Sequence, residues 1–213
     1  MIIRCIGHAS YLIELESGLR IVTDPYDAST GYPVHHVRAD VVTVSHGHHD
    51  HSAAETVEGW TQRIDREGVH TLAPEVTLEG VPSWHDDAQG AKRGPNLIFV
   101  LRAEGLTVAH LGDLGHPLTP EQCAIAPVDV ALIPVGGFFT IDAAQALRAA
   151  EQLKARVVIP MHYRTQYNAS WPIAPLEDFT ALLPQKPEEL DLLRVTKGDL
   201  ECQPRVAVLR PMP

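Results

Sequence analysis

The stretch Asp40-Val41-Val42-Thr43-Val44-Ser45-His46-Gly47-His48-His49-Asp50-His51 joins an apolar run to a cluster of four histidines and one aspartate. The run 41–45 is short and rich in β-branched residues, and polar side chains follow it at once, which predicts a buried strand. The cluster 46–51 therefore lies at a strand's end. Imidazole nitrogens and carboxylate oxygens are ligands of zinc, iron and manganese. The spacing His-x-His-x-Asp-His on a tight loop can direct alternate side chains toward two neighbouring metal ions.

An alternative is that 46–51 is a surface histidine tract that binds metal only adventitiously. Such a tract is expected at a terminus or in a polar linker, whereas this one directly follows a buried-looking strand. It also contains Asp50, the single acid that a hydrolytic site requires. These two features favour a functional metal site.

Length and composition limit the fold and the partners. With 213 residues, of which 45% are hydrophobic, the chain can bury a substantial core, and we expect one domain spanning 1–213. The formal net charge of −10, without a cluster of Lys and Arg, disfavours a nucleic-acid partner. The longest uncharged apolar stretch, 130–141, is too short to cross a bilayer, so we expect no membrane partner.

The N-terminal segment and the cysteines indicate a cytoplasmic protein. Residues 1–6 run directly into a strand pattern, with no long apolar segment and no small-residue cleavage site. Cys5, Cys123 and Cys202 are far apart and form no Cys-x-x-Cys pair, which disfavours both a disulfide framework and a cysteine zinc site. We interpret them as ordinary core or surface thiols.

Two blocks of the chain share one β pattern. Residues 11–16 and 19–24 predict a strand, a glycine turn and a second strand, and residues 97–102 and 106–110 predict the same arrangement. An acid follows each block, as Asp24-Pro25 in one and Gly112-Asp113 in the other. The repetition indicates two related halves.

Helices are predicted between the strands. Residues 53–67 carry apolar side chains at helical spacing and predict a surface helix directly after the metal loop. Residues 142–154 predict a clearer helix, which is followed by a strand over 156–160. A third helix is predicted over 176–183, and 205–209 predicts a last short strand.

Three further ligand candidates follow later predicted strands: His85, Asp113 and His162. A lone histidine is more often a hydrogen-bonded structural residue, and an aspartate in a Gly-Asp turn more often caps a helix. Three such residues at three strand ends, together with 46–51, favour a shared metal site. Loops that leave a rigid sheet can place polar groups in a cleft without breaking strand pairing.

Neighbouring polar residues compete with these candidates or support them. Asp86 and Asp87 stand beside His85 and compete with it as ligands. At this spacing His49 points away from its neighbours, so we expect that it is not a ligand. We expect His110 and His116 near the metals, in supporting positions.

The chain resembles the metallo-β-lactamase superfamily in the pattern His-x-His-x-Asp-His. Within it, the chain looks like the branch that holds L-ascorbate-6-phosphate lactonase and many uncharacterised metal-dependent hydrolases. The resemblance covers residues 2 to about 165. Besides 46–51, it is carried by the motifs Gly7-His8-Ala9-Ser10, Thr23-Asp24-Pro25, His110-Leu111-Gly112-Asp113, Gly136-Gly137-Phe138-Phe139-Thr140-Ile141-Asp142 and Ile159-Pro160-Met161-His162-Tyr163. It implies an α+β fold, a four-layer αβ/βα sandwich of two similar halves with the metals at the edge between the sheets.

The resemblance also implies a binuclear centre. It divides seven residues over two divalent transition-metal ions: His46, His48 and His85 on the first, Asp50, His51 and His162 on the second, and Asp113 as a bridge. Zinc is the first choice for both ions, and manganese and iron are the alternatives.

The implied function is a hydrolase that uses a metal-bound hydroxide to cleave a small ester, lactone or phosphoester. Two close cations lower the pKa of a shared water and polarise the bond under attack. Asp50 is the expected catalytic residue, because its carboxylate can orient the hydroxide and accept a proton. His8 and Asp24 are predicted to support the ligands, although a structural turn explains Asp24 equally well.

The substrate wall is assigned to the stretch after the last ligand. Tyr163 and Arg164 open the segment 163–171, which offers a cation and three aromatic groups and suits a small-molecule substrate with a carboxylate or phosphate. Phe138 and Phe139 are candidates for an opposite apolar wall, although core positions explain them equally well.

Two alternative functions stay open. One is a phosphodiesterase or nuclease on the same metal centre, which a salt-dependent affinity for nucleic acid would favour. The other is a non-catalytic metal-binding sensor or partner protein, which has no need of Asp50. The sequence leaves open the natural substrate and whether the chain forms a homo-oligomer.

Overall fold

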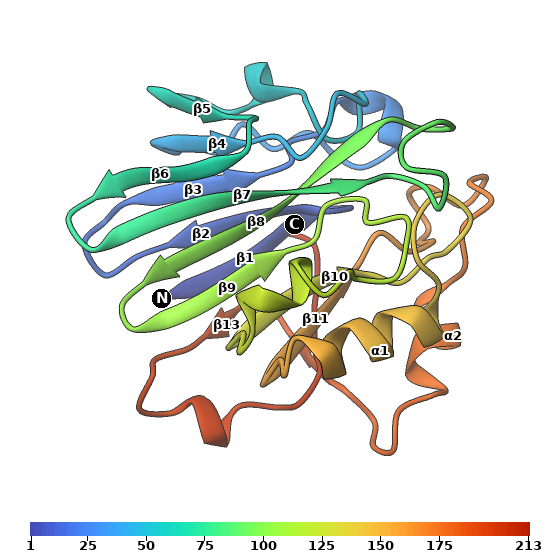
Figure 1. Ribbon diagram of the computed structural model, residues 1–213. Coiled ribbons are helices and arrows are strands. Elements are labelled where there is room, and N and C mark those ends of the chain that lie inside the picture. The colour runs from blue at the N-terminus through green and yellow to red at the C-terminus, as the bar shows by residue number, and fades with distance from the viewer.

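Two six-stranded sheets dominate the computed structural model, which describes all 213 residues (Figure 1). The first sheet has the order β13-β1-β2-β3-β4-β5 and the second the order β11-β10-β9-β8-β7-β6. The strands of the first sheet are β1 (Ile2–Gly7), β2 (Ser10–Glu14), β3 (Arg20–Thr23), β4 (Val41–Thr43), β5 (Gln62–Ile64) and β13 (Leu193–Arg194). Those of the second are β6 (Gly68–Ala73), β7 (Val76–Trp84), β8 (Pro95–Ala103), β9 (Leu106–His110), β10 (Val130–Pro134) and β11 (Val157–Met161). A separate pair joins β12 (Glu188–Leu190) to β14 (Ala207–Leu209).

The two sheets repeat one pattern of strand pairing. From β13 to β5, and likewise from β6 to β11, three antiparallel pairs are followed by two parallel pairs. In this correspondence β2 and β3 match β8 and β9, which are the two blocks of similar sequence. The predicted two related halves are therefore confirmed.

The main core lies between the facing sheets. A cluster of 27 buried residues contains Ile3 and Tyr11 from the first sheet and Phe99 and Leu132 from the second. Burying such side chains stabilises the fold by roughly 1.5–3 kcal/mol each before the cost of ordering the chain. Most strands are also covered on the outer face, which explains their continuous apolar runs.

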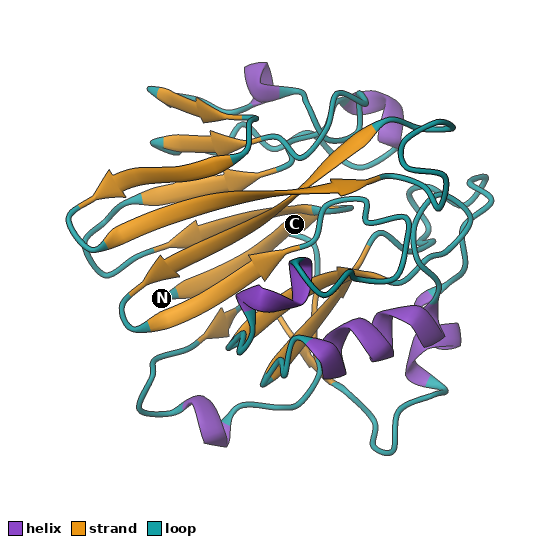
Figure 2. Cartoon of the chain, in the orientation of Figure 1, coloured by secondary structure: helices purple, strands orange, loops and turns teal.

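The outer layers of the sandwich differ between the two sheets. The helices α1 (Ala143–Gln152) and α2 (Leu176–Thr180) cover the second sheet and bury Ala149 and Phe179 against it. The outer face of the first sheet is covered by loops and the short 3-10 helices η1 (Ala28–Thr30) and η2 (Ala54–Thr56), as Figure 2 shows. Two further 3-10 turns are η3 (Gln122–Ile125) and η4 (Leu200–Cys202). The α+β sandwich is confirmed, with α-helices on the outer face of the second sheet only.

The predicted helix over 53–67 is wrong. Only η2 is helical there, and the chain turns at Gly59, which has a φ of +76°, before it enters β5. Ile64, 1% exposed, is buried because β5 pairs in parallel with β4, not because it lies on a helix face. The helical spacing of the apolar residues in this segment was coincidental.

The other predicted elements are present with shifted ends. The helix expected over 142–154 is α1, which begins after Asp142 with a capping box that includes Gln145. The helix expected over 176–183 ends earlier, as α2. The last predicted strand is β14, and the buried strand before the histidine cluster is β4. No helix of the protein has the length and apolar character needed to cross a membrane.

Candidate metal centre

Loops from both sheets bring the predicted ligands to one edge of the sandwich. The cluster 46–51 follows β4, and His8 follows β1, both in the first sheet. His85 follows β7, Asp113 comes after β9 and His162 follows β11, all in the second sheet. The two sheets meet here, since the N–H of His162 faces the carbonyl oxygen of His8 at 3.5 Å.

One group of donors contains the three residues predicted for the first metal. Ligand atoms of His46, His48 and His85 all lie within 4.8 Å of one another. The ring centroids of His46 and His48 are 4.7 Å apart, and His85 lies 4.7 and 5.0 Å from them. His46 and His85 are buried, whereas His48 is exposed on the cavity side.

A second group contains the three residues predicted for the second metal and adds a fourth. His8, Asp50, His51 and His162 are all buried and offer ligand atoms within 4.8 Å of one another. Asp50 Oδ2 lies 3.3 Å from His8 Nε2 and 3.5 Å from His51 Nε2. His8, expected only as a support, thus stands among the donors.

Asp113 lies between the two groups. Its Oδ2 is 3.1 Å from His85 Nε2 and 3.8 Å from His46 Nε2, on the side of the first group. It is also 3.2 Å from His162 Nε2, and Oδ1 is 3.2 Å from His51 Nε2, on the side of the second. This is the position that a bridging carboxylate requires.

Several of these residues adopt strained backbone conformations. His8, Asp24 and His162 have φ values of 53°, 40° and 54°. Non-glycine residues rarely enter this left-handed region, at a cost on the order of 1 kcal/mol each, and they persist there only when their surroundings hold them. Such residues often mark functional sites, and here all three lie at the donor groups.

Asp24 orients His51 by contacting the ring nitrogen that does not face the other donors. It accepts hydrogen bonds from the backbone N–H and the hydroxyl of Ser45, and its Oδ2 lies 2.9 Å from His51 Nδ1. His51 therefore turns Nε2 toward the cavity. Burial opposes ionisation of Asp24, but the hydrogen bond with His51 holds the pKa of Asp24 below its ordinary value. Asp24 thus supports a ligand candidate, while its positive φ also makes it a turn residue.

His110 and Asn96 brace the loop that carries Asp113. His110 Nε2 lies 2.8 Å from the carbonyl oxygen of Ala9, and its Nδ1 accepts the N–H of Gly112. The amide oxygen of buried Asn96 accepts the N–H of Asp113 at 2.9 Å. The sequence analysis missed Asn96, although a lone amide in an otherwise apolar strand was a usable signal.

Asp86, Asp87 and His116 lie outside both donor groups. Asp86 binds four backbone N–H groups of its own loop. Burial opposes its ionisation, but these hydrogen bonds lower the pKa of Asp86 to about 2. Asp87 is exposed and pairs with Lys92 at 2.6 Å, and His116 Nε2 accepts the N–H of Trp84. None of the three is placed to compete with His85.

Unpaired buried atoms show that the cluster fits metal ions. His46 Nε2, His51 Nε2 and Asp113 Oδ1 are among the buried polar atoms without a hydrogen-bond partner. Such an atom costs about 1–3 kcal/mol when it stays unsatisfied, and divalent cations would satisfy these atoms together. The mixture of imidazole nitrogens and carboxylate oxygens suits zinc, manganese or iron.

The protonation of the cluster also suits cations. Burial and the nearby His51 lower the pKa of His46 to about 3, and burial and His162 lower the pKa of His8 to about 4. These imidazoles are therefore neutral donors at neutral pH. Burial opposes ionisation of Asp113, but the histidines around it, led by His162 and His51, hold its pKa well below its ordinary value. His46 and His8 are thus neutral nitrogen donors that lie close to ionised carboxylates.

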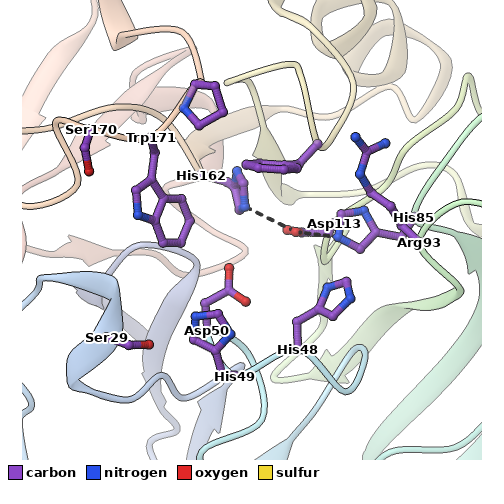
Figure 3. Close-up of a pocket in the computed structure, with 12 residues that line it drawn as sticks. Ser29, His48, His49, Asp50, His85, Arg93, Asp113, His162, Ser170 and Trp171 are labelled. Carbon is purple, nitrogen blue, oxygen red and sulfur yellow. Dashed lines mark ion pairs between the residues drawn. The ribbon is translucent and has the colours of Figure 1, made fainter.

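A cavity of about 550 Å³ opens onto both donor groups (Figure 3). It is lined by Ser29, His48, His49, Asp50, His85, Arg93, Asp113, Phe139, His162, Ser170, Trp171 and Pro172. Trp171 belongs to the predicted substrate segment, and Phe139 to the predicted apolar wall. His49 lines the cavity but joins no donor group.

Tyr163 and Arg164, which were predicted for the substrate wall, are not among the residues that line the cavity. The backbone of Arg164 pairs with Pro175, and its exposed side chain borders a different hollow. Tyr163 packs against the apolar cluster under the helices. Both point elsewhere because the chain turns sharply at His162, whose φ is 54°. The cation of the cavity is Arg93, for which the sequence analysis predicted no role.

Comparisons with known proteins agree with this geometry. A family model described as a beta-lactamase superfamily domain matches residues 2–162. A metal-dependent hydrolase of Carboxydothermus hydrogenoformans is 34% identical over 204 residues, covering 81% of this chain and 87% of that protein. A metal-dependent hydrolase of Pyrococcus furiosus is 31% identical over 215 residues, covering 85% of this chain and 91% of that protein.

Solved structures show the same similarity. A crystal structure from Thermotoga maritima, described as a Zn-dependent hydrolase of the metallo-β-lactamase superfamily, has a TM-score of 0.79 and 39% identity. The match covers 98% of this chain and 97% of that one. The short form of human tRNase Z has a TM-score of 0.59 at 11% identity, over 78% of this chain and 94% of that one, and so shares the fold alone.

Proposed function

This chain belongs to the metallo-β-lactamase superfamily and is a hydrolase, and we propose that it is a metal-dependent enzyme that cleaves a small ester, lactone or phosphoester. One observation carries the proposal. Two groups of donor side chains, with Asp113 between them, face a single cavity that could hold a small molecule.

The donors divide naturally over two cations. His46, His48 and His85 would hold one, and Asp50, His51 and His162 the other, with His8 as a further donor and Asp113 in contact with both groups. When bound, two divalent ions, with zinc as the first choice, activate a water molecule and polarise the bond to be cleaved.

Asp50 is the residue of the chain best placed to move protons. It lines the cavity, and His8 and His51 contact its Oδ2 at 3.3 and 3.5 Å. Burial opposes its ionisation, but His51 and His8 keep its pKa below its ordinary value, so the carboxylate is charged. It can accept a proton from water and return it to the leaving oxygen. Trp171 and Phe139 offer apolar surfaces to the rest of the substrate.

The cavity favours a small molecule over nucleic acid. Arg93 is the only Lys or Arg among its lining residues, and the whole chain carries a formal net charge of −10. Tracking a phosphate backbone requires several cations along a groove. We therefore propose a small-molecule substrate and no nucleic-acid partner. An affinity for single-stranded or duplex nucleic acid that falls steeply with salt would argue for the nuclease alternative.

The test combines metal analysis with variants of two aspartates. Elemental analysis of protein reconstituted with excess zinc, manganese or iron should find up to two ions per chain, and a panel of a small ester, a lactone and a phosphodiester should identify the reaction. Asp50→Ala should lower the rate at least about 100-fold while one metal ion remains on the histidine group. Asp191→Ala is the matched control, because that carboxylate is 82% exposed and pairs only with Arg210.

Two outcomes would contradict the proposal. A near-normal rate of Asp50→Ala on a substrate that the native protein turns over would remove Asp50 from catalysis. A chain that never holds more than one ion would contradict the binuclear arrangement.

His162→Ala leaves the Asp50 carboxylate in place, so it should retain a larger residual rate than Asp50→Ala when metal is in excess.

A further inference from the structure

We propose that Arg93 recognises an anionic group of the substrate, a carboxylate or a phosphate, and that Asp86 positions Arg93 for this role. The inference rests on the proposed function, because Arg93 lines the same cavity as the donor groups. It narrows the substrate to a small molecule that carries a negative charge apart from the bond to be cleaved.

The guanidinium of Arg93 is free to bind a ligand. No carboxylate lies within 4.0 Å of it, and it donates no hydrogen bond within the protein, although acids are frequent in this chain. The neighbouring cation, Lys92, is by contrast paired with Asp87 outside the cavity. Arginine presents several N–H donors in a planar fork that matches carboxylate and phosphate oxygens. A half-buried and unpaired fork at a cavity wall is therefore suited to an anion.

Phe139 orients this side chain. The Cζ atom of Arg93 lies 5.4 Å from the centroid of the Phe139 ring, within the range of a cation–π contact. Such a contact provides no oxygen acceptor to the guanidinium, so its N–H groups remain available for a ligand. Phe139, which lies between β10 and α1, also lines the cavity. Its ring therefore keeps the Arg93 side chain at the cavity wall.

Asp86 holds the backbone of Arg93. Its Oδ2 accepts the N–H groups of Arg93 at 2.7 Å and Lys92 at 2.9 Å. Its Oδ1 accepts those of Ala88 and Gly90 at 2.8 and 2.9 Å. One buried carboxylate thus closes the whole turn between β7 and β8, whose strands pair at Trp84 and Pro95.

The same turn carries a metal-ligand candidate at its other end. The N–H of His85 donates to the carbonyl oxygen of Gly94 at 3.1 Å, so His85 and Arg93 leave the base of the turn together. Figure 3 shows both side chains on one side of the cavity, with Trp171 on the other and Asp50 and His162 between them. A substrate could therefore place its charge at Arg93, its reacting bond at the donor groups and an apolar part on Trp171.

The experiment uses two esters that differ only in a distal charge. These are the 4-nitrophenyl monoester of adipate, whose free carboxylate is too distant to attack its own ester readily, and the same ester with that carboxylate methylated. With metal-loaded protein, Arg93→Gln should lower kcat/KM for the charged ester by about 10- to 100-fold, mostly through KM, and for the methylated ester by less than about threefold. Arg93→Lys should recover part of the difference, because lysine keeps the charge but not the fork.

Control variants separate recognition from structure. Lys92→Gln removes the adjacent cation, which faces away from the cavity, and should leave the ratio of the two kcat/KM values unchanged. Asp86→Asn keeps the shape of the side chain but loses acceptors for the turn. It should raise KM for the charged ester while metal content and kcat/KM for the methylated ester stay close to native values.

The outcomes distinguish this inference from the proposed function. Suppose that the native protein hydrolyses both esters and that Arg93→Gln lowers kcat/KM equally for both. Arg93 then does not recognise the negative charge, and the inference fails while the proposed function stands. If Asp86→Asn affects both esters equally or loses metal, Asp86 acts through His85 and its positioning role is rejected. If the native protein hydrolyses neither ester, calorimetric titration with adipate tests whether Arg93 binds a carboxylate. Binding that Arg93→Gln weakens at least about tenfold supports the inference, and equal or absent binding overturns it.

Discussion

His51 and His46 are neighbouring imidazoles whose pKa values move in opposite directions. Burial lowers the pKa of His46 to about 3. Burial also acts to lower the pKa of His51, but the carboxylates of Asp113 and Asp50 raise it well above its ordinary value. Asp24 strengthens this effect through the hydrogen bond at Nδ1. In the metal-free protein His51 therefore carries a proton between two acids, whereas His46 is neutral.

Metal binding to the second donor group should therefore release a proton. A cation that takes Nε2 of His51 must displace the proton there, so we expect about one proton released per chain from this residue and an affinity that falls as the pH is lowered. The sign follows from the raised pKa, because below it the proton competes with the cation. Calorimetric titration in two buffers of different ionisation enthalpy measures the release. His70→Ala, which removes an imidazole remote from the cavity, should behave like the native protein, and metal uptake without proton release would contradict the prediction.

At the scale of elements, the loops after β7 and β9 must pack closely to bring His85 to Asp113. The N–H of Gly115 donates to the carbonyl oxygen of Trp84 at 2.9 Å. A Cβ atom at Gly115 would overlap the backbone of His85 and Asp86. Only glycine allows this approach without displacing the loop that carries His85.

Gly115→Ala should consequently weaken metal binding at the first group. The added methyl group would push His85 away from Asp113, and we expect a loss of affinity of about 10- to 100-fold together with a stability loss of about 1–3 kcal/mol. Gly198→Ala is the control, because the nearest atom to its added Cβ would be Thr196 Oγ1 at 3.9 Å. Titration against a metal buffer and urea denaturation measure the two effects. Native affinity in Gly115→Ala would show that the loops tolerate separation.

The elements also show where a local pattern is a reliable guide. Helix α1, which was predicted over 142–154, has a buried apolar face and an Asp142 cap, and both features are local in the sequence. The apolar residues of 53–67 also had helical spacing. The chain turns at Gly59, however, and Ile64 lies in a strand that pairs with β4. Strand pairing is a long-range interaction, and no window of local sequence contains the partner.

On the scale of the whole molecule, the core is separate from the donor groups. Three apolar clusters lie between the sheets and on their outer faces, and none of them includes a donor residue. The donors sit on loops at the sheet edge. We therefore expect the fold to form without metal ions and to gain stability by linkage when they bind.

Chelation should accordingly destabilise the protein without unfolding it. Removal of metal at neutral pH should lower the melting temperature by about 10 °C, because a tightly bound ligand contributes several kcal/mol to a chain of this size. Far-UV circular dichroism at room temperature should change little, and added zinc should restore the melting temperature. Loss of the ellipticity in chelator would instead identify a structural metal site and favour a non-enzymatic protein.

By itself, the sequence determined the two related halves and the buried strand before 46–51. It also determined the strand ends that carry the later ligand candidates. Each of these features depends on a short run of neighbouring residues. Only the tertiary structure decided that His8 joins the second donor group and that Arg93, not Arg164, lines the cavity. Both depend on where loops from different sheets meet and on the direction in which each chain leaves its strand. Such contacts join residues far apart in the chain, so their geometry is set by the packing of the two sheets.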